Sequence, residues 1–121
     1  MNKLQILKSA KEVLKIESKA INDLAKSLND DFFRAVKSIE SLKGKLIISG
    51  VGKSGNIASK IAASFTSTGI PSVFLNPVDA SHGDMGIIRA EDILIVLSNS
   101  GESHELSDLL DFAKRKLVKI I

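Results

Sequence analysis

The chain has 121 residues, of which 44% are apolar and 26% are charged, a balance typical of one folded domain with one core. It contains five Phe but no Trp or Tyr, which argues against a base-stacking nucleic-acid surface, and its net charge of +3 comes from lysines spread along predicted helices. The lack of cysteine excludes disulfides, thiolate metal sites and a cysteine nucleophile. No apolar run approaches the ~20 residues of a membrane span, and the charged N-terminus lacks a signal-peptide core. We therefore expect a cytoplasmic protein with no nucleic-acid and no membrane partner.

The first third of the chain is predicted to be helical. Residues 2–28 form one long helix, because apolar residues recur near a single stripe with Lys and Glu between them: Leu4, Leu7, Val13, Leu14, Ile16, Ile21 and Leu24. Residues 29–31 cap a second helix, which Gly44 ends as a C-terminal glycine cap. The short loop between them predicts an antiparallel helical hairpin over residues 1–44. Such a hairpin serves as a dimer arm or active-site cover, or it simply packs against a sheet edge.

From residue 45 the pattern changes to strand, turn and helix. Strands are expected at 46–49, 71–75, 92–97 and 117–121, and helices at 56–68 and 103–116, with a loop over 76–90 that has room for one helical turn. The helix at 56–68 carries Ile57, Ile61 and Phe65 on one face and ends at Gly69. This βαβαβ order predicts an α/β fold, an open parallel sheet with flanking helices in a three-layer, flavodoxin-like arrangement.

Two turns of this core have the chemistry of an anion site. The first, Gly50-Val51-Gly52-Lys53-Ser54-Gly55, joins a buried strand to a helix, and the second, Ser98-Asn99-Ser100-Gly101-Glu102-Ser103, does the same. A helix start presents unpaired backbone N–H groups and the positive end of the helix dipole, which favour a phosphate. Because the carboxyl ends of parallel strands share one edge, we expect both turns and the 76–84 segment to lie together. The alternative is that the serines only cap a helix.

Two common nucleotide motifs fit the first turn poorly. The pattern G-x-G-x-x-G matches the dinucleotide fingerprint, but the acidic residue that holds the ribose is missing, since the second strand ends in Phe74-Leu75-Asn76 and Asp79 lies beyond it. Gly52-Lys53-Ser54 also matches the end of a P-loop, but the first glycine of that motif would fall on Ile47, inside the strand.

The combined motifs resemble a known family. The two turns together are similar to the SIS (sugar isomerase) domain, and the segment Asn76-Pro77-Val78-Asp79-Ala80-Ser81-His82-Gly83-Asp84-Met85-Gly86 resembles the D-arabinose 5-phosphate isomerases of the Kdo (lipopolysaccharide sugar) pathway. The resemblance implies interconversion of D-ribulose 5-phosphate and D-arabinose 5-phosphate through an enediol, without a cofactor, in a homo-oligomer (dimer or tetramer). Its length implies that residues 1–121 are a single SIS domain, incomplete at the C-terminus.

The resemblance also implies roles for particular residues. The phosphate would be held by Gly52, Ser54, Ser98, Asn99, Ser100 and Ser103. Lys53 would stabilise the developing oxyanion or anchor the substrate, and Glu105 would be the acid/base. His82, with Asp84 to orient it, would shuttle a proton, open the sugar ring or bind an inhibitory divalent metal. Glu102 and Glu105 would otherwise only complement a helix dipole. The alternative function is a non-catalytic phosphosugar-binding module or an inactive remnant of the enzyme.

Overall fold

This computed structural model describes residues 2–101 and 103–121, so the expectation for Glu102 lies outside the described residues. The chain divides into two compact units, Met1–Val36 and Lys37–Ile121, each of which is described by itself. No helix in the described part of the chain is long and apolar enough to cross a membrane. The pairing of the predicted helical hairpin concerns both units and stays a prediction.

The first unit contains helix α1 (Lys3–Ser27) and the start of α2 (Asp30–Glu40). Residue Asn2 caps α1, because its side chain accepts a hydrogen bond from the Gln5 N–H while the Gln5 side chain accepts one from the Asn2 N–H, both at 2.9 Å. The predicted helix over 2–28 is thus confirmed within one residue at each end.

The predicted role of Gly44 is wrong. Helix α2 ends at Glu40, four residues earlier, and Gly44 does not have the positive φ of a glycine cap. Glycine is needed here for close packing, since a Cβ at position 44 would lie 2.3 Å from Oδ1 of Asp92. The glycine therefore admits the Asp92 side chain beside the backbone that leads into the first strand.

The second unit is built on a four-stranded parallel sheet in the order β2-β1-β3-β4. The strands are β1 (Leu46–Gly50), β2 (Ser72–Phe74), β3 (Ile93–Leu97) and β4 (Lys119–Ile120). Strand β1 is fully buried, as expected for a parallel strand covered on both faces. In the register of β1 with β3, Gly50 lies opposite Leu97, so the two central strands end side by side.

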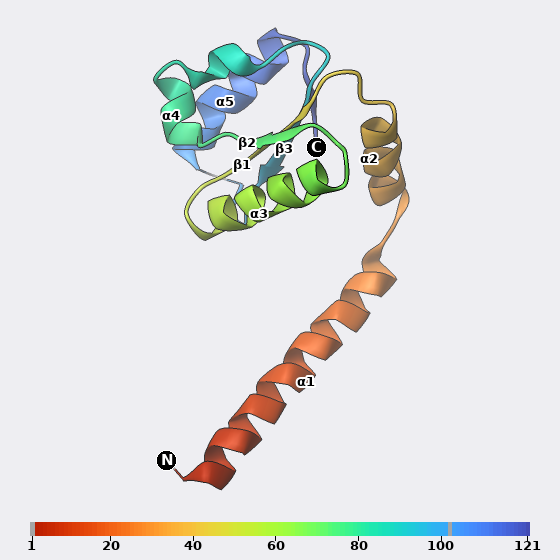
Figure 1. Ribbon diagram of the computed structural model, residues 1–121, viewed down its shortest axis with the longest axis vertical. Helices are drawn as coiled ribbons and strands as arrows, with labels where there is room; N and C mark the ends of the chain where they lie inside the picture. Colours follow the sequence, from red (N-terminus) through yellow and green to blue (C-terminus); the bar gives the residue numbers. More distant parts are fainter. Residues whose placement is uncertain (1, 102) are drawn as a thin grey trace. The chain divides into compact units, whose positions relative to one another are not determined.

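Helices cover both faces of the sheet, as Figure 1 shows: α3 (Lys53–Ser67) lies on one face, and α4 (Pro77–Ser81) and α5 (His104–Arg115) lie on the other. Alternate residues of β1 supply two cores. Leu46 and Ile48 pack with Ala58 and Ala62 of α3, whereas Ile47 packs with a set from the other face that includes Leu109. The predicted three-layer α/β fold is confirmed.

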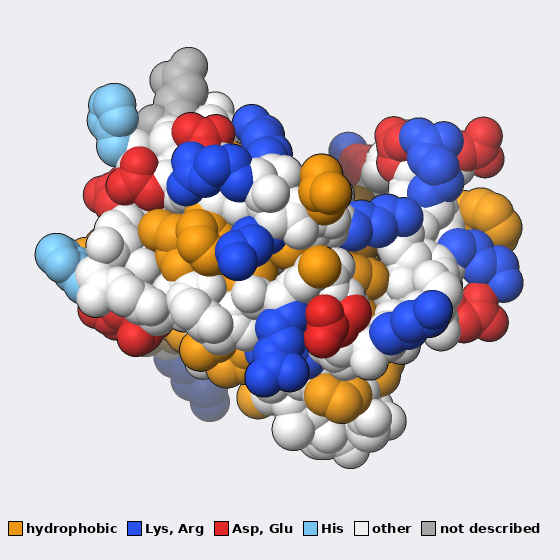
Figure 2. All heavy atoms as spheres, turned by 90° about the horizontal axis from the view of Figure 1, so that it is seen from above, with side chains coloured by type: hydrophobic (Ala, Val, Ile, Leu, Met, Phe, Trp, Pro, Cys, Tyr) orange, Lys and Arg blue, Asp and Glu red, His pale blue; other side chains and the backbone are white. Residues whose placement is uncertain are grey.

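The structure adds detail that the sequence pattern missed. The loop expected over 76–90 contains α4 and a 3-10 helix, η1 (Asp84–Ile87). Helix α4 begins where the Asn76 side chain accepts a hydrogen bond from the Val78 N–H at 3.0 Å, with Pro77 in the first helical position. On the face drawn in Figure 2, Lys and Arg side chains are interspersed with acidic ones, in keeping with the spread of charge in the sequence.

Candidate functional site

The start of α3 is shaped by glycines. Gly52 is the N-cap with φ +58°, and α3 begins at Lys53 rather than at residue 56 as predicted. A Cβ on Gly55 would lie 2.6 Å from the carbonyl oxygen of Gly50, so only glycine lets the helix start so close to the end of β1. Lys53 and Ser54 therefore belong to the first helical turn, which aims backbone N–H groups at the sheet edge.

The backbone N–H groups of Lys53 and Ser54 have no backbone acceptor among the described residues, which leaves them open to a ligand. The next two N–H groups, of Gly55 and Asn56, donate to the carbonyls of Val51 and Gly52, at 3.4 and 3.2 Å. This is the arrangement expected of an anion site at a helix N-terminus.

The second turn is held by its own hydrogen bond. Ser98 Oγ accepts from the N–H of Gly101 at 2.8 Å, and Gly101 has φ +75°. Ser103 is the N-cap of α5, but its side chain makes no capping hydrogen bond. The side chain of Ser103 therefore does not cap α5, and the alternative that the serines only cap a helix does not hold for this residue.

The two turns meet in a depression of about 460 Å³ at the carboxyl ends of β1 and β3. Its lining comes from α3 and from the end of β3: Lys53, Ser54, Ile57, Val96, Leu97, Ser98 and Asn99. In the strand order β2-β1-β3-β4, the chain leaves β1 for one neighbour and returns to the sheet on its other side. Ligands of open parallel sheets bind at such a point, where the strand order reverses.

Ile57 is a lining residue whose position the sequence pattern misjudged. The helical period puts it on one face with Ile61 and Phe65, but its side chain is 58% exposed while the other two pack into the core. The signal in the sequence is its spacing, because Ile57 lies four residues after Lys53 and so points to the same side of α3. It forms an apolar wall beside the polar groups.

A neighbouring depression of about 390 Å³ contains Gly52, together with Gly50, Val51, Gly55, Asn56, Ser59, Phe74, Asn76 and Val78. Ser49, at the end of β1, does not face either depression. It is fully buried, and its hydroxyl donates to the carbonyl of Leu75 at 2.7 Å, which ties the end of β1 to that of β2.

Four predicted residues lie outside both depressions: His82, Ser100, Ser103 and Glu105. His82 is exposed at the end of α4, and Glu105 is exposed in the first turn of α5. The predicted contact of Asp84 with His82 is not formed, since no hydrogen bond or ion pair joins them among the described residues. The structure thus joins Lys53 and Ser54 with Ser98 and Asn99 and does not bring the predicted acid/base groups to them.

A metal site is not evident in the described parts of the chain, residues 2–101 and 103–121. Within them, no group of three or more His, Asp or Glu side chains is placed to hold an ion. The inhibitory metal at His82 stays a prediction.

A buried carboxylate lies at the amino ends of the strands, opposite the candidate site, and the sequence pattern gave no reason to single it out. Asp92 is 3% exposed and accepts hydrogen bonds from the N–H and Nζ of Lys45, at 2.9 and 2.7 Å, and from the N–H of Arg89 at 2.8 Å. Burial raises the pKa of this carboxyl, but the hydrogen bonds and the Lys45 charge outweigh it, so the pKa lies below its ordinary value of 3.8. Asp92 joins the starts of β1 and β3 and has a structural role.

Comparison with known proteins decides the family. Residues 39–121 match the family model of the SIS domain. The chain belongs to the SIS domain family. The match covers the whole sheet and both turns of the candidate site.

Relatives of this SIS domain include arabinose 5-phosphate isomerase KdsD of Yersinia pestis, 45% identical over 93% of this chain and 34% of the relative. Uncharacterized protein RP505 of Rickettsia prowazekii is 45% identical over 92% of this chain and 35% of that protein. The chain thus spans about a third of the length of the curated relatives it matches.

Solved structures agree in fold with this SIS domain. A Listeria monocytogenes protein that is provisionally assigned as a sugar-phosphate isomerase has a TM-score of 0.94 and 35% identity, over 99% of this chain and 63% of that one. An Escherichia coli CFT073 protein solved in complex with arabinose 5-phosphate has a TM-score of 0.92 and 38% identity, over 99% of this chain and 64% of that one.

Proposed function

We propose that this chain carries the phosphate-binding part of an aldose–ketose isomerase that interconverts D-ribulose 5-phosphate and D-arabinose 5-phosphate. The observation that carries the proposal is the depression between β1 and β3, where Lys53 and Ser54 meet Ser98 and Asn99. The similarity to KdsD over 93% of the chain and to a structure solved with arabinose 5-phosphate supports it.

The phosphate group would lie against the start of α3. The N–H groups of Lys53 and Ser54 and the hydroxyls of Ser54 and Ser98 offer donors to a dianion at a helix N-terminus. Asn99 of the same depression is a further donor. The assignments of Gly52, Ser100 and Ser103 as phosphate ligands depend on the family resemblance, because these residues do not line this depression. These groups recognise the phosphate, and the apolar wall formed by Ile57 limits where the sugar chain can lie.

The reaction moves one proton between C1 and C2 of the sugar. From ribulose 5-phosphate, a base removes the proton from C1, the electron pair forms the C1–C2 double bond of an enediolate, and the proton returns at C2 as the carbonyl forms at C1. We assign the base to Glu105, oxyanion stabilisation to Lys53 and proton transfer between the oxygens to His82. The assignments of Glu105 and His82 depend on the family resemblance, because both residues lie outside the depression.

The setting that fits this reaction is a cytoplasmic homo-oligomer that supplies arabinose 5-phosphate to Kdo synthesis. No redox cofactor takes part, because the substrate and product have the same oxidation level.

The test is an isomerase assay on the purified chain and its Lys53→Ala variant. We expect turnover of ribulose 5-phosphate to arabinose 5-phosphate, and a fall in kcat of about 100-fold or more in Lys53→Ala, since removing a group that stabilises an oxyanion has effects of this size. Lys60→Ala, an exposed lysine of the same helix outside both depressions, is the matched control and should keep full activity. Equal activity of the two variants would remove Lys53 from the mechanism.

The second candidate is a phosphosugar-binding module without turnover. It is favoured by the separation of the acid/base candidates from the depression. Pentose 5-phosphates would then raise the Tm of the chain while no isomerisation is detected. The absence of a Tm shift with any sugar phosphate would count against both functions.

A further inference from the structure

The depression between β1 and β3 has a polar side and an apolar side. The polar side comes from the first turn of α3 and the turn after β3: Lys53, Ser54, Ser98 and Asn99. The apolar side comes from the next turn of α3 and the end of β3: Ile57, Val96 and Leu97. A ligand that fills this depression must therefore carry an anionic or polar group directly beside an apolar one.

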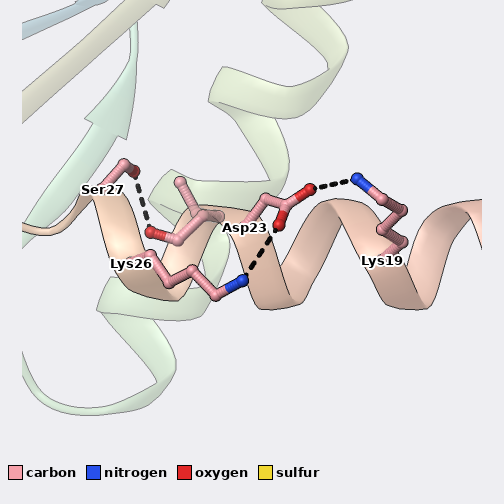
Figure 3. Close-up of polar contacts among 5 residues, drawn as sticks. Lys19, Asp23, Lys26 and Ser27 are labelled. Atoms are coloured by element: carbon pink, nitrogen blue, oxygen red, sulfur yellow. Dashed lines mark hydrogen bonds and ion pairs between the residues drawn. The ribbon is translucent and has the colours of Figure 1, made fainter.

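The cation of the polar side is available to a ligand. Within the described residues, no ion pair or hydrogen bond involves the Nζ of Lys53. On helix α1, by contrast, Lys19 and Lys26 both pair with Asp23, at 2.7 and 3.4 Å, as Figure 3 shows. An anion can thus use Lys53 and the free N–H groups at the start of α3 without breaking an existing ion pair.

Ile57 is the exposed part of the apolar side. Its side chain is 58% exposed, whereas Val96 and Leu97 are partly buried and pack against the two cores. Ile57 lies four residues after Lys53, so it is one turn, or about 6 Å, further along the same side of α3. An anion bound at the start of α3 therefore has an apolar surface within one helical turn of it.

This juxtaposition restricts which carbon can follow the phosphate in the ligand. In a phosphate ester of a primary alcohol, a CH₂ group follows the ester oxygen, and covering it with an apolar surface is favourable. In an anomeric phosphate, the same carbon also bears the ring oxygen, and a polar atom against an apolar surface loses hydrogen bonds to water. The depression thus favours a terminal CH₂–O–phosphate group.

We propose that Ile57 is a specificity-determining residue, which selects sugar phosphates with a terminal CH₂–O–phosphate group over anomeric phosphates. Its side chain contacts that methylene group while the start of α3 binds the phosphate. The inference rests on the phosphate site of the proposed function, and it names the class of ester that this site accepts. It does not depend on turnover, because the contact is measured through binding.

Alkyl phosphates test the contact without a sugar. In NMR titrations that follow the amide signals of Lys53 and Ser54, propyl phosphate should bind the parent about fourfold more tightly than methyl phosphate, since two more methylene groups are partly covered. In Ile57→Ala this ratio should fall below about twofold, whereas Ile57→Leu keeps an apolar side chain and should retain it. Ile87→Ala is the control, because Ile87 is also exposed but lies outside this depression, and it should leave the ratio unchanged.

Arabinose 5-phosphate and arabinose 1-phosphate test the selection itself. The parent should bind the 5-phosphate at least about fivefold more tightly, and Ile57→Ala should narrow the difference to about twofold or less. Equal binding of methyl and propyl phosphate by the parent, or ratios that Ile57→Ala leaves unchanged, would overturn the role of Ile57 while leaving the phosphate site in place. If inorganic phosphate does not shift the Lys53 and Ser54 signals at all, the phosphate site of the proposed function is wrong, and this inference fails with it.

Discussion

Leu117, just after the end of α5, has a left-handed backbone conformation that is unfavourable for leucine. It follows α5 with φ +58° and is 87% exposed. Its N–H donates to the carbonyl of Lys114, and the N–H of Val118 donates to that of Ala113, at 3.1 and 2.9 Å. These bonds form a Schellman motif, in which glycine is the preferred residue at the position of Leu117.

Leu117→Gly should therefore stabilise the protein. Glycine adopts positive φ without the steric cost of about 1 kcal/mol that a Cβ carries, and little packing is lost from so exposed a side chain. We expect the free energy of unfolding in urea to rise by about 0.5–1 kcal/mol, less than the full amount because glycine also gains freedom in the unfolded chain.

Leu117→Ala is the matched control, since it shortens the side chain but keeps the Cβ, and it should bring no such gain. A Leu117→Gly protein less stable than Leu117→Ala would show that the conformation is not the cost inferred from its φ.

The contact between β1 and α3 decides the geometry of the candidate site at the scale of elements. Gly50 and Gly55 face each other, and Cβ atoms on them would lie within 3 Å of backbone atoms of the other element. The first turn of α3, with Lys53 and Ser54, can reach the sheet edge only because neither residue has a side chain.

Gly55→Ala should push α3 away from β1. We expect a loss of about 1–3 kcal/mol in unfolding free energy, as found for overpacked sites, together with weaker binding of pentose phosphates in calorimetry. Gly86→Ala is the control, because its Cβ would have no neighbour within 4 Å and its φ is not positive. If the two variants were equally stable and bound equally well, the close approach would not be needed.

Sequence periodicity located every strand and most helices of this fold because the apolar pattern is strong. It placed the start of α3 three residues late, because a glycine inside a first turn looks like a loop until the neighbouring backbone of Gly50 is known. Between β2 and β3 it allowed for one helical turn but did not locate the two short helical segments, since segments of four or five residues have no period to detect.

At the scale of the whole molecule, parallel topology was the most informative prediction. It brought the turns after β1 and β3 to one edge, and the depression lined by Lys53 and Ser98 confirms their proximity. The positions of His82 and Glu105 could not be foreseen in this way, because a motif identifies a residue type and spacing but not the direction in which an exposed side chain points. The exposure of Ile57 could not be foreseen either. Its helical spacing predicts a buried side chain, but Ile57 borders the depression beside the turn after β3.

The candidate site lies at the carboxyl ends of the strands, whereas Asp92 lies at their amino ends, where it makes the stability of the fold depend on pH. Because its folded-state pKa lies below the ordinary 3.8, the carboxylate contributes stability that is fully present above the unfolded-state pKa. That contribution is lost as the pH falls from about 5 through the unfolded-state value toward the folded-state pKa. The parent protein should therefore lose unfolding free energy as the pH falls over this range.

Asp92→Asn should remove this contribution at neutral pH. The amide supplies one acceptor oxygen where the carboxylate supplies two, so at least one of the three part-buried donors from Lys45 and Arg89 loses its acceptor. We expect a loss of about 2–4 kcal/mol at pH 7, measured by urea unfolding, and a shallower decline of stability between about pH 5 and 3 than in the parent. Asp111→Asn is the control, because Asp111 is exposed and pairs with Lys114 only at 3.6 Å, so its loss should stay within about 0.5 kcal/mol. Parallel acid profiles for the parent and Asp92→Asn would show that another carboxyl controls the acid stability of the sheet.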